Sequence, residues 1–176
     1  MRKLLLLIAI VGIGFTANAQ KNVFKVNPLG LVFGALDVSY ERVLSEKSAI
    51  ELGFAYSNFD VTGVSTKVST NGYGVEGKYK FYFSSEKDAP RGWYGAPFLA
   101  YSVSSVDSDG IKGDANSFSA GALAGYQWVF GGGDSGFSLD LNFGAQYVSA
   151  STTGNINSVS IDGFLPRLGL SLGYAW

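Results

Sequence analysis

The sequence predicts an all-β fold, an eight-stranded antiparallel up-and-down transmembrane β-barrel, and three observations support this prediction. Apolar residues alternate with small or polar residues in one segment after another, which is the pattern of strands with a single apolar face. The chain is rich in residues that favour strands and turns, with ten Tyr, thirteen Phe and 24 Gly. Most of the apolar stripes run through 11 to 13 residues, which is close to the ~9–11 that cross a bilayer on a tilt and longer than ordinary strands.

The beginning of the chain predicts export from the cytoplasm. The stretch "MRKLLLLIAIVGIGFTANAQ" places two basic residues before an apolar run and ends in a small-residue site, Ala-Asn-Ala, at 17–19. The apolar run is shorter than the ~20 residues of a spanning helix, so it has the layout of a secretory signal peptide. We therefore expect residues 1–19 to be a cleaved signal peptide and residues 20–176 to form one barrel domain.

Composition excludes several classes of function. Without the signal peptide, eleven basic residues face fourteen acidic residues, a net charge of −3, and no basic patch is present to bind nucleic acid. The chain has no Cys, so we expect neither disulfides nor lipid attachment at the signal site. It also has no His, and the usual pairs of nucleophile and base are therefore missing. We expect no enzymatic activity, no cofactor and no metal.

Eight segments of the mature chain alternate as strands should, and the connections between them differ in length. The longer connections (60–71, 104–117 and 150–163) and the shorter ones (45–47, 84–91 and 131–135) alternate along the chain, except that the first connection, 34–35, is short where a long one is due. Outer-membrane barrels have this layout, with short periplasmic turns and longer external loops. The predicted strands are 22–33, 36–44, 48–59, 72–83, 92–103, 117–130, 136–149 and 164–176.

The charged phase of each strand is predicted to face the lumen. In "GYGVEGKYKFYF" (72–83) the aromatic and aliphatic residues share one phase, whereas Glu76, Lys78 and Lys80 share the other. A Lys facing the bilayer midplane would cost about 2–4 kcal/mol, so these side chains must point inward. The first segment is less regular, because "PLGLVFG" is apolar in both phases, and a bulge near Pro28 would reconcile it. The predicted lumen charge network, close to charge balance, consists of Asp37, Glu41, Glu51, Glu76, Lys78, Lys80, Asp140 and Arg167.

A soluble barrel of lipocalin type, with the apolar phase inside, is the alternative arrangement. Three features favour the membrane barrel: the long apolar stripes, the aromatics gathered at strand ends, and an opposite phase too rich in Gly, Ala and Ser for a water-facing surface. The chain also lacks the Gly-x-Trp start and the closing helix typical of lipocalins.

On these residues the chain resembles the small eight-stranded outer-membrane barrels of Gram-negative bacteria, the OmpA/OmpX-like outer membrane protein beta-barrel domain group. "KVNPLGLVFGALDVSYERVLSEKSAIELGFAYS" (25–57) is similar to the opening hairpins of porin-family members, and "FLPRLGLSLGYAW" to their closing strand. The resemblance implies that Tyr174 and Trp176, at the antepenultimate and final positions, form the assembly signal for the barrel-insertion machinery. The Gly usual five residues from the end is replaced by Ser171, so the match is partial.

These observations predict a structural or surface-interaction role in the outer membrane. The expected partners are outer-membrane lipid or lipopolysaccharide, the barrel-assembly machinery, and a surface ligand or protein bound by three long external loops. A narrow porin-like channel for ions or small solutes is the second interpretation, and a secreted lipocalin-like carrier is the third. The loop "DSDGIKGD" brings Asp107, Asp109 and Asp114 together, but it lacks the rest of a calcium loop, and a solvated acidic loop is favoured.

Overall fold

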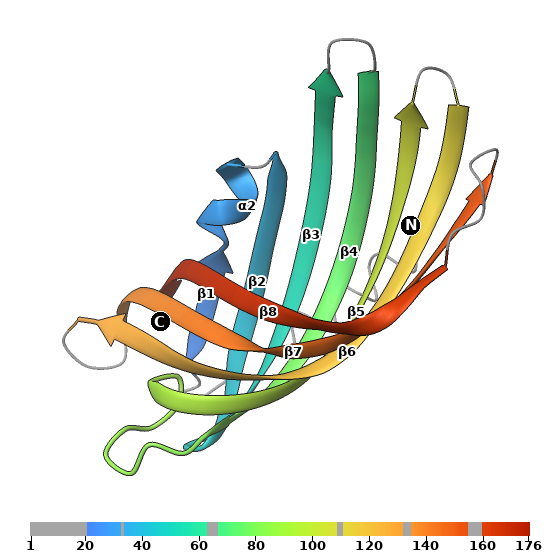
Figure 1. Ribbon diagram of the computed structural model, residues 1–176. Helices are drawn as coiled ribbons and strands as arrows, with labels where there is room; N and C mark the ends of the chain where they lie inside the picture. Colours follow the sequence, from blue (N-terminus) through green and yellow to red (C-terminus); the bar gives the residue numbers. More distant parts are fainter. Residues whose placement is uncertain (1–20, 33, 63–66, 109–110, 132–134, 155–159) are drawn as a thin grey trace, which may run out of the picture.

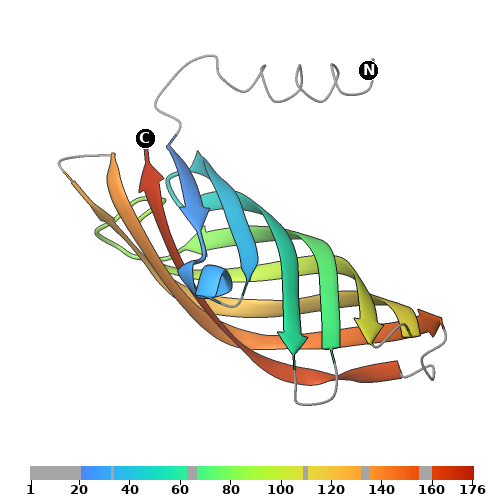
Figure 2. The ribbon, with the colours of Figure 1, turned by 90° about the horizontal axis from the view of Figure 1, so that it is seen from above.

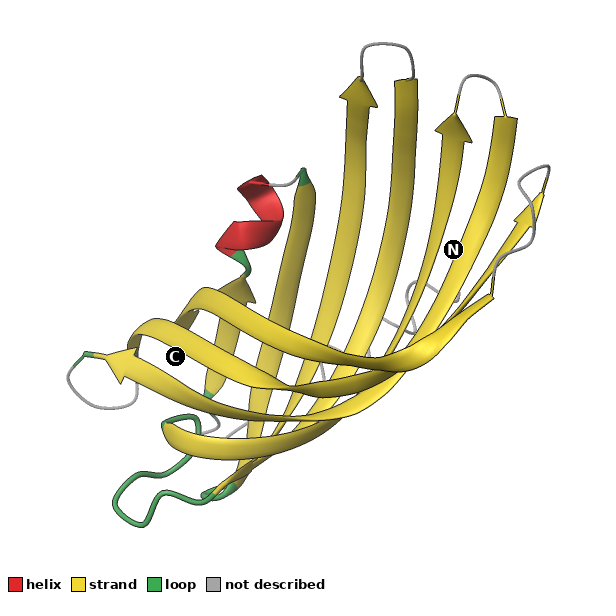
Figure 3. Cartoon of the chain, viewed as in Figure 1, coloured by secondary structure: helices red, strands yellow, loops and turns green. Residues whose placement is uncertain are grey.

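The computed structural model shows a closed barrel of eight antiparallel strands with one short helix, which confirms the predicted all-β fold (Figures 1 and 3). It describes residues 21–32, 34–62, 67–108, 111–131, 135–154 and 160–176. Each strand pairs with its neighbour in sequence, and β1 pairs with β8 to close the barrel. The elements are β1 (Asn22–Val26), α2 (Pro28–Val32), β2 (Ala35–Ser45), β3 (Ser48–Thr62), β4 (Lys67–Tyr82), β5 (Gly92–Ser108), β6 (Ile111–Phe130), β7 (Gly136–Gly154) and β8 (Ser160–Ala175).

The strands extend well beyond their predicted bounds, so the prediction of three long external loops was wrong. The β3–β4 pairing continues to Thr62 and Lys67, and the β5–β6 pairing continues to Ser108 and Ile111. The predicted loops are rich in Val, Thr and Ser, which fit a strand, and continued pairing satisfies the backbone hydrogen bonds of these segments. Three long hairpins therefore form one end of the barrel, the hairpin end. The β2–β3, β4–β5 and β6–β7 connections and the C-terminus form the other end, the turn end (Figure 2).

The first predicted strand, 22–33, was also wrong in its second half, because the chain leaves the sheet after Val26 and forms α2. Pro28 has no backbone N–H to donate to a ladder and suits the first position of a helix. Asn27 acts as the N-cap, since its Oδ1 accepts hydrogen bonds from Leu29 N at 3.0 Å and Gly30 N at 3.4 Å. A helical turn therefore occurs where the sequence suggested a bulge, and the connection to β2 is longer than predicted.

The outside of the barrel is apolar, and a group of charged residues lies inside. Large hydrophobic side chains stand exposed around the strands, including Leu52, Val75, Leu99, Phe143 and Leu168. Inside, by contrast, Lys25, Glu41, Glu51, Lys80 and Asp140 are buried. This distribution is the reverse of the one expected for a water-soluble barrel. Within the described residues, no helix has both the length and the apolar character needed to cross a membrane.

A small apolar cluster fills the lumen at the turn end. Ala89 and Pro90, in the β4–β5 connection, are buried there, and Ala89 N donates a hydrogen bond to Glu46 O at 2.8 Å. Lys47 Nζ reaches the carbonyl oxygens of Ser84 and Lys87 at 2.9 and 3.0 Å, which fastens this connection to the β2–β3 turn. The cluster comprises Val43, Ala49, Tyr82, Ala89, Tyr94 and Ala96. This end of the lumen is therefore closed by packed side chains.

Candidate functional site

Two lysines and three carboxylates form a buried ionic layer across the lumen, next to the apolar cluster. Lys25 Nζ lies 2.8 Å from Glu51 Oε2 and 2.7 Å from Asp140 Oδ2, and it also bonds Glu41. Lys80 Nζ lies 2.9 Å from a carboxylate oxygen of each of the two glutamates and 2.7 Å from Asp140. Each of these five side chains is at most 3% exposed. Burial on this scale is tolerated only where every charge is paired.

Three further side chains add hydrogen bonds to the ionic layer. Tyr82 Oη donates to Glu41 Oε1, and Tyr94 Oη donates to Asp140 Oδ1, both at 2.6 Å. Gln127 Oε1 accepts from the ammonium groups of Lys25 and Lys80 at 2.8 and 2.9 Å. The carboxylates therefore accept from both ammonium and phenol donors, which strengthens a network in a low-dielectric interior.

Strand register explains why these groups meet. Glu41 is paired across β2 and β3 with Glu51, and Glu51 is paired across β3 and β4 with Lys78. Two glutamates directly opposite each other would repel, so cations from other strands are needed between them. Lys25 on β1 and Lys80 on β4 have stems long enough to reach that position.

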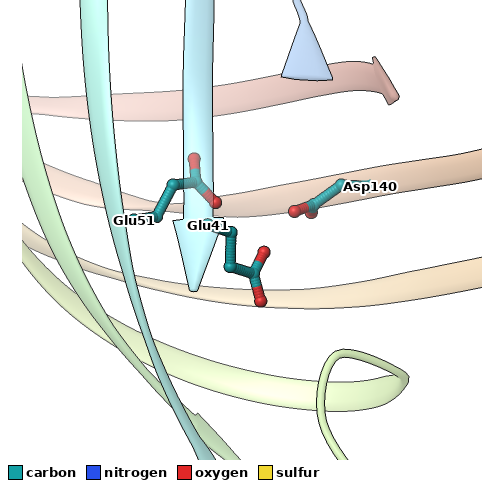
Figure 4. Close-up of side chains that lie close together, drawn as sticks. All are labelled: Glu41, Glu51 and Asp140. Carbon is teal, nitrogen blue, oxygen red and sulfur yellow. The ribbon is translucent and has the colours of Figure 1, made fainter. Parts of the chain in front are cut away.

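Three carboxylates of the ionic layer have oxygens within 4.8 Å of one another, close enough to hold a metal ion (Figure 4). Glu41, Glu51 and Asp140 converge on one space from β2, β3 and β7. The ammonium groups of Lys25 and Lys80 take the positions beside these oxygens. The cluster is therefore satisfied as an ion-pair network by the protein's own cations.

A second group of charges lies on the hairpin side of the ionic layer. Lys78 Nζ bonds Glu51 at 2.8 Å and Glu76 at 2.9 Å, and Arg167 Nη1 bonds the other oxygen of Glu76 at 2.5 Å. The Arg167 guanidinium also lies over the Phe98 ring, 4.4 Å from its centroid. Through these contacts four cations and four carboxylates of the lumen are linked in one chain of ion pairs.

The structure brings seven of the eight predicted lumen residues into this network and places the eighth apart from it. Asp37 lies nearer the hairpin end, where its Oδ2 accepts a hydrogen bond from Asn27 Nδ2 at 3.1 Å. Sequence reasoning left out Lys25, Tyr82, Tyr94 and Gln127 from the network. Their inward phase in the strands could have revealed them, but the two tyrosines and the amide carry no charge signal.

A polar cavity of about 200 Å³ occupies the lumen between the charged groups and the hairpin end. Its polar lining includes Asp37, Ser39, Glu76, Ser102, Asn142 and Arg167. Because packed side chains close the lumen on the turn side, this cavity is a blind cup. We call it the cup below.

Two other predicted features lie elsewhere. Tyr174 and Trp176 are exposed on the outside at the seam, where the backbone N–H and C=O of Trp176 each bond Asn22 at 2.9 Å. Of the acidic stretch near the β5–β6 connection, Asp114 accepts a hydrogen bond from Ser105 Oγ at 2.7 Å, and Asp107 is paired in register with Lys112. Asp109 lies outside the described residues, as does the predicted signal peptide, which stays a prediction.

Comparisons with known proteins place the chain in a family. No curated protein matches the sequence. The translocator domain of the autotransporter NalP from Neisseria meningitidis is a similar solved structure, with 13% sequence identity and a TM-score of 0.44. The match covers 95% of this chain and 64% of that one, so the chain spans less than two thirds of the solved chain. A family model matches residues 4–154, most of the sequence, and the chain therefore belongs to the family described as protein of unknown function (DUF3575).

Proposed function

We propose that the protein is an outer-membrane β-barrel with a structural or surface-interaction role and a closed lumen. The observation that carries this proposal is the inverted distribution of side chains, with large hydrophobic groups outside and paired charges inside. In lipid an apolar outer face is stable, and a closed sheet leaves few backbone groups without partners. In water the same face would be a hydrophobic patch around the whole molecule.

The closed lumen favours a structural role over a channel. The ionic layer and the apolar cluster lie one behind the other, and both are buried. A small barrel of eight strands has an interior that side chains can fill. An ion crossing it would have to separate buried pairs such as Lys80–Asp140, and leaving a buried charge uncompensated is strongly unfavourable.

The two ends of the barrel suggest the remaining parts of the proposal. The three hairpins would stand on the external side and contact lipopolysaccharide, another cell or a partner protein. Tyr174 and Trp176, exposed at the end of β8, would be recognised by the barrel-assembly machinery after removal of the signal peptide.

Four measurements test the proposal. The folded protein should sediment with the outer-membrane fraction and dissolve only when detergent is added. Its mobility in a detergent gel should change when the sample is boiled. A photoreactive label confined to the bilayer should modify outward residues such as Phe81 and Leu141, and it should leave Glu41 untouched. In planar bilayers the protein should give no steady unitary currents. Steady currents would support the narrow channel instead, and a detergent-independent soluble protein would support the lipocalin-like carrier.

A further inference from the structure

The seam that closes the barrel is paired over only part of its length. The β1–β8 pairing runs from Val23 and Ala175 to Val26 and Leu172, and there β1 ends. On its other side β8 stays paired with β7 as far as Ser160. Toward the hairpin end one edge of β8 therefore has no strand partner among the described residues, and α2, which contacts both β2 and β8, lies beside this edge (Figures 1 and 2). We call this part of the seam the lateral opening.

The sequence of β8 fits an open edge. The backbone N–H and C=O of Trp176 point toward β1. Because backbone groups alternate between the two edges of a regular strand, those of every even-numbered residue of β8 point to this same edge. Pro166, which has no N–H to donate, is one of these residues, and edges are among the few positions where a sheet tolerates Pro. The neighbouring Phe164 and Leu168 are the most exposed large hydrophobic residues of the described part, at 80% and 84%.

Two cavities lie on either side of this part of β8, one with polar groups in its lining and one that is almost wholly apolar. Inside is the cup, and outside is an apolar groove of about 460 Å³ that runs from Trp93 and Trp128 across β7 and β8 to Leu29 of α2. The segment Leu168–Leu170 and Asn142 line both compartments. A ligand that spans them must therefore have a polar head and an apolar chain.

The charges around the cup indicate the chemistry of the head group. Lys78, Arg167 and Glu76 are paired with one another, and Glu51 is paired within the ionic layer. Asp37 lines the cup and accepts a hydrogen bond from the Asn27 amide, and none of the ion pairs among the described residues includes it. A cationic head would compensate this carboxylate, whereas an anionic head would add to the local negative charge. The cup also offers hydroxyl groups from Ser39, Ser102 and Ser171 to a hydroxylated head.

We propose that the cup, the lateral opening and the groove bind a single-chain amphiphile with a small hydroxylated ammonium head, which enters sideways from the membrane between α2 and β8. The ammonium group bonds Asp37, the hydroxyls bond the serines of the cup, and the alkyl chain lies in the groove. The volume of the cup suits a small head, since it has room for several water-sized groups of about 30 Å³ each. This inference rests on the proposed placement in a membrane.

Tryptophan quenching in lipid vesicles tests the proposal, because Trp93 and Trp128 line the groove. The probe is a long-chain 2-amino-1,3-diol brominated in its chain, and the comparison probes are a fatty acid and a 1,3-diol with the same brominated chain. The aminodiol should quench saturably at a low mole fraction, and the fatty acid should quench only in proportion to its mole fraction. Asp37→Asn should weaken aminodiol binding about tenfold, which is the loss of one charge-assisted hydrogen bond. Asp114→Asn, at an exposed acid elsewhere, should leave binding unchanged.

A second pair of variants tests the cup independently of charge. A Cβ at Gly53 would make only ordinary contacts, 3.6 Å or longer, and Phe at this position would fill the cup. Gly77 is a matched control, because it is paired with the adjacent Leu52 and its Cβ would meet only Leu52 Cδ2 at 3.9 Å, outside the barrel. Gly53→Phe should abolish saturable quenching, and Gly77→Phe should keep it, with both variants showing the gel mobility of the folded barrel.

The outcomes separate this inference from the proposed function. Equal, unsaturable quenching by all three probes would mean that only bulk lipid fills the groove, and it would overturn the inference. Saturable binding that survives either Asp37→Asn or Gly53→Phe would also overturn it. In each of these cases the barrel would still be integrated in the vesicles. A protein that does not integrate at all would overturn the proposed function and this inference together.

Discussion

Replacing Asp140 by Asn removes one charge from the ionic layer with almost no change of shape. Asp140 Oδ2 lies 2.7 Å from the Nζ atoms of both Lys25 and Lys80, and its Oδ1 accepts the Tyr94 hydroxyl at 2.6 Å. The variant leaves two buried lysines with one carboxylate fewer. Breaking a buried ion pair by removing one partner costs about 3–5 kcal/mol, and we expect a loss in this range.

Urea unfolding in phospholipid vesicles, followed by tryptophan fluorescence, measures this loss. Because ΔG falls with urea by roughly 1–3 kcal/mol per molar, the midpoint should drop by about 1–5 M at an unchanged slope. Asp88→Asn is the matched control: it makes the same chemical change in the ion pair with Lys47, whose two side chains are about half exposed. Solvent screens that pair, so its removal should shift the midpoint little.

A double variant distinguishes charge imbalance from lost packing. Lys80→Met removes one cation, and combined with Asp140→Asn it restores the balance of the network. The double variant should be less destabilised than the sum of the two single variants, by a coupling energy of about 0.5–3 kcal/mol. If Asp140→Asn costs no more than Asp88→Asn, or if the effects of Asp140→Asn and Lys80→Met simply add, the ionic layer does not stabilise the barrel through its paired charges.

Three further substitutions test other parts of the structure. Asn27→Ala removes the cap of α2 and should cost about 1 kcal/mol in vesicle unfolding, whereas Asn27→Ser should restore most of it; equal losses would contradict the capping role. Tyr82→Phe removes a buried donor to Glu41 and should cost about 1–3 kcal/mol, and an unchanged midpoint would show that water replaces the hydroxyl. Leu141→Lys places a charge on the outer face and should cost about 2–4 kcal/mol in vesicles; a neutral effect would place this face in water rather than lipid.

The sequence was sufficient to predict the strand faces, because alternation is a local property. Glu76, Lys78 and Lys80 share one phase of a single strand, and only an inward orientation is compatible with an apolar outer face. The number of strands and their antiparallel order followed from the same pattern and were confirmed by the structure. A period-two pattern fixes which face a residue lies on but not which residues on that face come into contact.

Features that depend on the whole barrel could not be predicted in this way. Lys25 reaches the centre of the network because β1 pairs with β8 when the barrel closes. This closure brings Lys25 into contact with Asp140, which is 115 residues away in the sequence. The α2 turn follows from a competition between Asn27 capping and strand pairing, and its local signs were the Asn27-Pro28 pair and the apolar residues in both phases of "PLGLVFG". The length of the hairpins was missed because Ser, Thr and Gly occur both in loops and in the solvated ends of paired strands.

The charges of the lumen also fix the register of the strands, which the outer face cannot do alone. A slip of one residue in β4 would turn Lys78 and Lys80 outward, at about 2–4 kcal/mol for each lysine near the bilayer midplane. A slip of two residues would keep the faces but would move Lys78 away from Glu51, its partner across β3 and β4. Lipid chains contact any apolar side chain almost equally, so the outer face barely distinguishes these registers. A well-packed apolar lumen can equal the ionic layer in stability, but it would not penalise the shifted pairings as the paired charges do.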